Sequence, residues 1–471
     1  MNQDFFKKRR AGILLHPTSL PGKGDLGQEA YNFVDFLANS GISLWQMLPL
    51  GPPHDDLSPY QCQSVHAANP VLISLEHLVK KGWITEQSSL KEARIGFEKN
   101  ANQADRAAFL AFIEEHKYWL EDYALFRALR LEHNNVAWWD WSPDLRDRVP
   151  QALKAAKLRL KSIIEQNRFE QFVFFSQWHE LKEYAHEKGV YLFGDIPIFV
   201  AEDSADVWAC RENFLLDAEG KATIVAGVPP DYFSETGQRW GNPHYNWDYM
   251  QENGFSWWRE RLKSANLLFD VARIDHFRGF EASWAIPASC KTAIEGEWIK
   301  VPGEALFNTL TDIDLPLVAE DLGIITREVT ALREKFGLPG MKILQFAFDG
   351  GNDNPYLPHN LIEECIVYTG THDNNTTLGW FNELPEHTQH YVCDYLHVAS
   401  NDMPWSLIEA AFASVAQWAI IPMQDVLALD GTHRMNIPSV EKGNWCWRFE
   451  WSQLPPDINN NLRQLCNDSG R

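Results

Sequence analysis

The amino-acid sequence predicts an α/β protein, a closed (β/α)8 barrel with large subdomains inserted after its second and third strands. Eight short apolar runs rich in branched residues recur along the chain, and segments with helical periodicity lie between them. Two of the intervals are too long for an ordinary connection between a strand and a helix. Near-continuous apolar strands that alternate with amphipathic helices indicate a parallel sheet covered by helices, and eight such strands point to a closed barrel.

The predicted strands follow one another as short runs of apolar residues. They are residues 11–15, 42–48, 190–193, 267–274, 315–319, 341–346, 365–368 and 418–421. The interval over residues 54–185 predicts a mainly helical insertion, because residues 106–115, 118–131 and 150–166 carry apolar side chains at helical spacing. Residues 200–260 are rich in Gly, Pro, Trp and Tyr and predict a loop-rich insertion over the active-site cleft. Residues 1–471 would then form a single catalytic barrel that carries both insertions.

The composition argues against several classes of protein. The 471 residues include 42 Lys and Arg against 64 Asp and Glu, a formal net charge of −22, which makes nucleic acid and membranes poor partners. No stretch approaches the roughly 18 apolar residues of a membrane span, and the apolar run after the basic residues 7–10 is too short for a signal peptide. The seven cysteines contain no C-x-x-C pair, so neither a disulfide framework nor a zinc ribbon is expected. We expect a cytoplasmic protein, or one of the plastid stroma if this is a processed plant protein.

Aromatic residues make up 13% of the chain, with 20 Trp, and many of them stand beside polar residues. Examples are residues 138–141 (WWDW), 238–242 (QRWGN) and 445–448 (WCWR). Flat rings beside amide, carboxyl and guanidinium groups suit a neutral, hydroxyl-rich ligand such as a sugar, whose CH faces stack on rings while its hydroxyls take polar partners. Packing in the core is the alternative for any single ring.

The segment Gly22-Lys23-Gly24-Asp25-Leu26-Gly27 matches the dinucleotide-binding pattern G-x-G-x-x-G. Its context does not fit a nucleotide site. Pro17 and Pro21 separate the glycines from the preceding strand, and the next strand ends without an acid that could bind ribose. A turn before a helix that starts near Gln28 explains the segment better, and no cofactor is expected.

Three acidic residues stand at the ends of predicted strands: Asp275, Glu320 and Asp373. In an α/β barrel the C-terminal strand ends face one mouth, so these residues are expected to converge although they lie far apart in the sequence. A single acid at a strand end can simply cap the next helix. Three acids, two of them beside a histidine (Asp275 and Asp373), favour an active site.

Convergent carboxylates without a cluster of cysteine or histidine indicate glycoside chemistry, in which one carboxylate attacks the anomeric carbon and a protonated carboxyl donates to the leaving oxygen. Arg273 lies two residues before Asp275 and is expected to keep it ionised as the nucleophile. Glu320 becomes the acid/base, with its pKa raised by anionic neighbours and desolvation, and Asp373 would grip ring hydroxyls. Binding of Mg²⁺ or Ca²⁺ is the rival, but the neighbouring cationic side chains would repel a metal, so none is expected.

The segments around the acids carry a specific pattern: residues 273–280 (RIDHFRGF), 319–323 (AEDLG) and 370–374 (GTHDN). Further segments of the same kind are residues 12–22 (GILLHPTSLPG), 58–60 (SPY), 194–198 (GDIPI), 227–243 (GVPPDYFSETGQRWGNP), 434–436 (RMN) and 443–448 (GNWCWR). Together they resemble the 4-α-glucanotransferases (amylomaltases or disproportionating enzymes), glycoside hydrolase family 77, which are relatives of the α-amylases. The resemblance spans nearly the whole sequence.

This resemblance implies Asp275 as nucleophile, Glu320 as acid/base and Asp373 as transition-state stabiliser. It also implies sugar contacts from Tyr60, Asp195, Arg273 and His372. Asn436 is a further expected sugar contact. Residues 227–243 combine turn formers with Tyr232, Phe233 and Trp240, as a loop over the cleft would if it stacked on an acceptor sugar and excluded water. A rigid surface loop is the alternative for this segment.

The expected activity is retaining transfer of an α-1,4-glucan segment to the 4-hydroxyl of another glucan, with cyclisation of long donors. Its partners would be maltooligosaccharides, amylose or starch-like glucans, with glucose as an acceptor. Two alternatives stay open. An α-1,4-glucan hydrolase of the α-amylase superfamily would use the same acids, since only the group that intercepts the glycosyl-enzyme differs. A non-catalytic glucan-binding barrel is the other, although the presence of all three acids argues against it.

Overall fold

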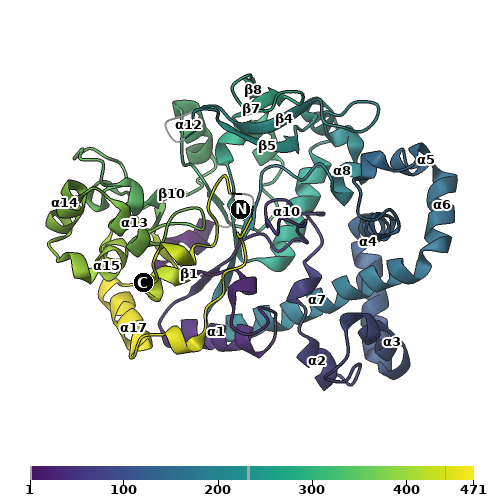
Figure 1. Ribbon diagram of the computed structural model, residues 1–471, viewed down its shortest axis with the longest axis horizontal. Helices are drawn as coiled ribbons and strands as arrows, with labels where there is room; N and C mark the ends of the chain where they lie inside the picture. The colour runs from purple at the N-terminus through teal and green to yellow at the C-terminus, as the bar shows by residue number, and fades with distance from the viewer. Residues whose placement is uncertain (1–2, 231–233, 441) are drawn as a thin grey trace.

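The computed structural model describes residues 3–230, 234–440 and 442–471 (Figure 1). Its centre is a parallel sheet of eight strands in the order β10-β11-β12-β1-β2-β3-β6-β9. The strands are β1 Arg10–Leu14, β2 Leu44–Gln46, β3 Tyr191–Ile196, β6 Val271–Ile274, β9 Leu317–Ala319, β10 Gly340–Ile343, β11 Cys365–Tyr368 and β12 Trp418–Pro422. The two edge strands β9 and β10 meet where the Ala319 N–H donates to the Pro339 carbonyl at 3.0 Å. The predicted (β/α)8 barrel is therefore confirmed, with one predicted strand at each of the eight positions.

The strands bury both faces, which explains their near-continuous apolar sequences. One set of side chains fills the barrel interior, among them Phe193, Val271, Val318, Tyr368 and Trp418. The alternate residues of the same strands pack outward against the helices. Because side chains alternate along a strand, the residue two positions after an interior residue also points inward, one step nearer the C-terminal mouth.

Helices fill the interval between β2 and β3. They are α2 Leu75–Lys80, α3 Leu90–Asn100, α4 Gln103–Glu132, α5 Pro143–Arg146, α6 Pro150–Arg159 and α7 Lys161–Glu187. Residues 106–131, which the sequence suggested as two helices, form the single helix α4, whereas residues 150–166 are divided between α6 and α7. Helices α3, α4 and α6 stand to the right of the barrel, and α7 runs back beneath it toward β3 (Figure 1). The boundaries of this insertion as a separate unit remain a prediction.

Residues 200–260 hold more regular structure than the expected loop. They contain α8 Ala205–Ala209, β4 Ile224–Val228, β5 Gln238–Pro243, α9 Trp247–Glu252 and the start of α10 Ser256–Leu268. Strands β4 and β5 join β7 Ala282–Pro287 and β8 Glu297–Lys300 in an antiparallel sheet of order β5-β4-β7-β8, at the top of Figure 1. The predicted strand 267–274 began too early, because residues 267–268 end α10.

The remaining helices cover the barrel. They are α1 Gln28–Asn39, α11 Gly303–Asn308, α12 Arg327–Lys335, α13 Thr377–Glu383, α14 Glu386–Leu396, α15 Trp405–Ala413, α16 Met423–Val426 and α17 Ile458–Ser469. Among the described residues, no helix is both long and apolar enough to cross a membrane.

Candidate active site

The three acids follow three barrel strands at their C-terminal ends. Asp275 directly follows β6, Glu320 directly follows β9, and Asp373 lies in the loop after β11. Alternation along the strands explains two of these positions: Glu320 comes two residues after the interior Val318, and Asp275 two residues after Arg273, which itself follows the interior Val271 by two. The same rule places Asp195 two residues after the interior Phe193.

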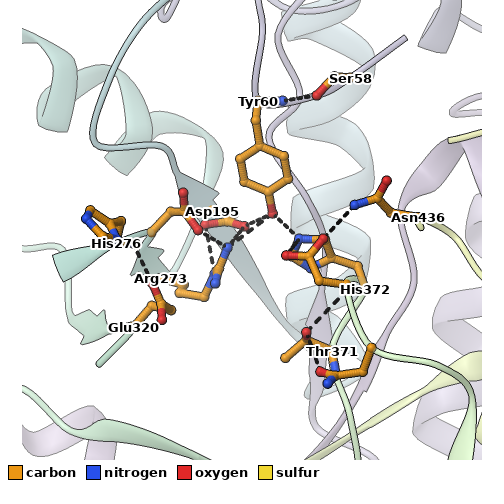
Figure 2. A network of polar contacts seen from close by, with 12 residues as sticks. Ser58, Tyr60, Asp195, Arg273, His276, Glu320, Thr371, His372 and Asn436 are labelled. Carbon is orange, nitrogen blue, oxygen red and sulfur yellow. Dashed lines mark hydrogen bonds and ion pairs between the residues drawn. The ribbon is translucent and has the colours of Figure 1, made fainter. Parts of the chain in front are cut away.

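Arg273 is the centre of the polar network in Figure 2. Its Nε donates to Asp195 Oδ1 at 3.0 Å and its Nη2 to Asp195 Oδ2 at 2.8 Å, which makes the ion pair bidentate. Nη2 also donates to Asp275 Oδ1 at 2.7 Å and to the Tyr60 hydroxyl at 3.1 Å. Arg273 and Asp195 are each only 4% exposed, so the pair lies inside the protein below the mouth.

The pKa values in this network follow from burial among several anions. Burial opposes the charge on Arg273, but Asp195, Tyr60 and Asp275 together raise the pKa of Arg273 well above its usual value. Burial raises the pKa of Asp275 to about 8; Arg273 opposes this shift, whereas Asp195, Glu320 and Asp373 add to it. Arg273 does favour the ionised form of Asp275, as expected. Without sugar, however, desolvation raises the pKa of Asp275 by more than Arg273 lowers it.

Glu320 accepts two backbone hydrogen bonds, one on each carboxyl oxygen. The His276 N–H donates to Oε2 at 2.7 Å and the Leu322 N–H to Oε1 at 2.9 Å. The His276 backbone is left-handed, with φ 51° and ψ 51°. Burial raises the pKa of Glu320, while the Arg273 charge and the two N–H donors oppose the shift. Glu320 therefore holds its proton to higher pH than a solvated glutamate does, because burial raises its pKa.

Asp373 is the most open of the three acids, with its side chain 54% exposed. Asn436 Nδ2 donates to Asp373 Oδ1 at 2.7 Å, and Arg434 Nη2 donates to the Asp373 carbonyl at 2.7 Å. His372 Nε2 lies 2.9 Å from the Tyr60 hydroxyl, and the two rings are stacked with centroids 5.2 Å apart. Burial lowers the pKa of His372, which therefore favours the neutral imidazole.

The structure brings most of the expected sugar contacts to one place. Tyr60, Asp195, Arg273 and His372 form one hydrogen-bonded network, and Asn436 joins it through Asp373. Trp240 on β5 meets the His276 ring edge to face, with centroids 4.8 Å apart, so the antiparallel sheet reaches the mouth. Tyr232 and Phe233 lie outside the described residues.

Two pockets border these side chains. One, of about 440 Å³, lies between His16, His372, Asn375 and Trp447. The other, of about 600 Å³, is lined by Tyr60, Asp195 and Arg261 among others. In the part of the chain that the structure describes, no group of three or more His, Cys, Asp or Glu side chains is arranged to hold a metal.

Some residues near the site are not among the expected site residues. Trp445 lies 6.0 Å from both Tyr60 and His372 between ring centroids; its segment, residues 443–448, is one of those that carry the family resemblance, but the ring itself is not among the expected sugar contacts. Asp425 on α16 binds both ends of the loop that carries Asp373. Its partners precede it by 48 and 56 positions, and nothing in the local sequence separates it from an ordinary acid in the first turn of a helix.

Comparisons with known proteins agree with this geometry. A family model described as 4-alpha-glucanotransferase matches residues 15–453. A 4-alpha-glucanotransferase of Thermus thermophilus is 48% identical, over 98% of this chain and 99% of that protein, and one of Synechocystis is 47% identical over 98% of each. The solved structure of an amylomaltase from Streptococcus agalactiae in complex with acarbose superposes with a TM-score of 0.95 at 37% identity, and the match covers 98% of this chain and 100% of that one. The chain belongs to the 4-α-glucanotransferase family, glycoside hydrolase family 77.

Proposed function

We propose that this protein is a 4-α-glucanotransferase that cleaves an α-1,4 bond in a maltooligosaccharide or starch-like glucan and passes the segment to the 4-hydroxyl of another glucan or of glucose. Membership of the family supports the reaction. The observation that carries the assignment of residues is the position of Asp275, Glu320 and Asp373 at C-terminal barrel ends around the buried Arg273 pair. Long donors such as amylose would also close on themselves. The proposed location is the cytoplasm, or the plastid stroma for a processed plant protein.

The proposed mechanism is a double displacement. Asp275 attacks the anomeric carbon while Glu320 donates its proton to the leaving O4, which leaves a glycosyl ester on Asp275. The 4-hydroxyl of the acceptor then gives its proton to Glu320 and attacks the same carbon. Two inversions at one carbon retain the α configuration, and both carboxyls return to their starting states.

The other site residues are proposed to bind sugar. Asp373, oriented by Asn436, would accept hydrogen bonds from ring hydroxyls as the sugar flattens toward the oxocarbenium-like transition state. Tyr60, His372, Asp195 and Arg273 would line the same subsite. Trp240, with Tyr232 and Phe233 on the same segment, would stack on the acceptor and keep water from the glycosyl ester.

Incubation with maltotriose tests the reaction. A transferase is expected to produce glucose together with a ladder of chains longer than the donor, because the glycosyl ester passes to sugar. Separation of the products by chromatography at several times measures this directly. Glucose and maltose without longer chains would instead support a hydrolase, and no cleavage at all would support a glucan-binding protein without activity.

Glu320→Gln tests the acid/base assignment through the pH dependence. The active form needs Glu320 protonated and Asp275 ionised, so activity should fall at low pH as Asp275 gains a proton and at high pH as Glu320 loses one. The variant should lose about 10²- to 10⁴-fold in cleavage of maltotriose. It should still release fluoride from maltosyl fluoride in the first step, because fluoride leaves without a proton, whereas the later transfer of the glycosyl ester should be slow because no base takes the proton of the acceptor.

With that fluoride donor the alkaline limb of the variant's profile should disappear. The acid limb should stay where it is, because Glu320 is already uncharged when Asp275 ionises to give the active form. An unchanged profile on both donors would contradict the assignment of Glu320.

A further inference from the structure

Asp425 lies at the base of the loop that carries His372 and Asp373. It belongs to α16, directly after β12, and is 1% exposed. Thr369, the first residue after β11, donates from its hydroxyl to Asp425 Oδ2 at 2.6 Å. Thr377, the first residue of α13, donates from its hydroxyl to Oδ2 at 2.6 Å and from its backbone N–H to Oδ1 at 2.7 Å. One carboxylate thus joins both ends of residues 369–377.

Residues 434–436, a few positions after Asp425, hold the middle of this loop. Arg434 and Asn436, which follow Asp425 in sequence, bind the carbonyl and the carboxylate of Asp373 at 2.7 Å each. Gln345 adds a hydrogen bond of 2.9 Å to the Asn375 carbonyl from the side of β10. The loop is therefore fixed at its two ends by Asp425 and at its middle by residues 434–436.

The stability of the fold does not by itself explain why residue 425 is a carboxylate. No ion pair with Asp425 is recorded among the described residues, and burial raises its pKa although three donors oppose the shift. A buried carboxylate without a cation beside it costs desolvation free energy, which its hydrogen bonds must offset. A carboxylate, however, accepts all three hydrogen bonds without needing a donor of its own, which fixes the spacing of the two loop ends.

We infer that Asp425 is a positioning residue, which ties the ends of residues 369–377 together and thereby sets where Asp373 presents its carboxylate to the sugar. The inference rests on the proposed role of Asp373. Asp425 itself is too deeply buried, at 1% exposed, to reach the sugar. It acts through the loop, and a small shift of Asp373 would weaken the hydrogen bonds that strengthen in the transition state.

Asp425→Asn tests this inference, because it keeps the shape of the side chain but turns an NH₂ group toward the two threonine hydroxyls. We expect kcat for cleavage of maltotriose to fall about 100-fold, the loss typical of a misplacement near 1 Å. KM should change little, because the lost interaction belongs to the transition state. Thr369→Val should act in the same direction, whereas Thr369→Ser, which keeps the hydroxyl, should restore most of the rate.

Asp270→Asn is the matched control. Asp270 also accepts a backbone hydrogen bond, from the Leu192 N–H at 2.7 Å, and contacts His186 Nε2 at 2.9 Å, but it lies at the opposite end of the barrel, before β6. This variant should lower the unfolding temperature and leave kcat unchanged. Asp425→Asn in an Asp373→Asn background should cost much less than in the native protein, because residues that act as a unit are not additive.

Three results would overturn the inference. They are a native rate in Asp425→Asn, an equal loss of kcat in Asp425→Asn and Asp270→Asn at equal stability, or a loss from Asp425→Asn that is as large in the Asp373→Asn background as in the native protein. Failure of the proposed function is distinct from these, because it would appear in the native protein as absence of longer chains from maltotriose. The comparison of cleavage rates would still test Asp425 in that case, since a hydrolase would use Asp373 in the same way.

Discussion

Asp275→Ala should abolish transfer and leave a folded protein that still binds glucan. Without the carboxylate no glycosyl ester can form, and loss of a nucleophile in a double displacement is expected to cost about 10⁴-fold or more in kcat. The Arg273–Asp195 ion pair does not depend on Asp275, so the network below the mouth remains. Release of glucose from maltotriose measures the rate, and calorimetric titration with maltotriose measures binding.

The same variant should be as stable as the native protein near neutral pH, or more stable. The pKa of Asp275 is raised in the folded protein, so its contribution to stability falls as pH rises above the ordinary value for aspartate, and removal of the side chain relieves that cost. Asp312→Ala is the control, because Asp312 pairs with Arg259 on the surface, where its side chain is 63% exposed, and should leave the rate unchanged. Turnover within tenfold of native in Asp275→Ala would remove the assignment of the nucleophile.

The barrel and its acids could be predicted because each rests on a local pattern. A strand buried on both faces has a short apolar sequence, as in residues 365–368. In a parallel barrel, an acid directly after such a strand lies at the C-terminal mouth. The antiparallel sheet β5-β4-β7-β8 could not be predicted in this way. β5 changes from exposed at Gln238 to buried at Pro243 without alternation and carries Gly241, and β4 pairs with β7 only after the chain has passed through α10 and β6.

The pKa values near the site likewise depend partly on local sequence and partly on three-dimensional packing. The neighbour Arg273 is visible in the sequence two residues before Asp275, but burial, the larger influence on the pKa of Asp275, depends on three-dimensional packing. Asp425 is the extreme case, since its whole role comes from contacts with Thr369 and Thr377. Sequence patterns therefore find residues that act at strand ends and miss residues that hold them in place.

Arg273→Met should cause the largest loss of stability at the site. The change leaves the Asp195 carboxylate, whose side chain is 1% exposed, buried with the Tyr60 hydroxyl but without a cation. Removing one partner of a buried ion pair typically costs about 3–5 kcal/mol of unfolding free energy. Chemical denaturation should show this loss, and it should grow as pH rises above the ordinary pKa of aspartate, about 3.9, because the unpaired acid is tolerated only when protonated.

The double variant Arg273→Met with Asp195→Asn separates the cost of an unpaired charge from the loss of function. With both charges removed, no buried ion is left unpaired, so the double variant should be more stable than Arg273→Met alone. Its transfer rate should stay low, because neither the Arg273 contact to Asp275 nor the proposed sugar contact of Asp195 returns. Additive losses of stability in the double variant would mean that the two side chains stabilise the fold independently, and the bidentate pair would then not be the element that holds Asp275 at the mouth.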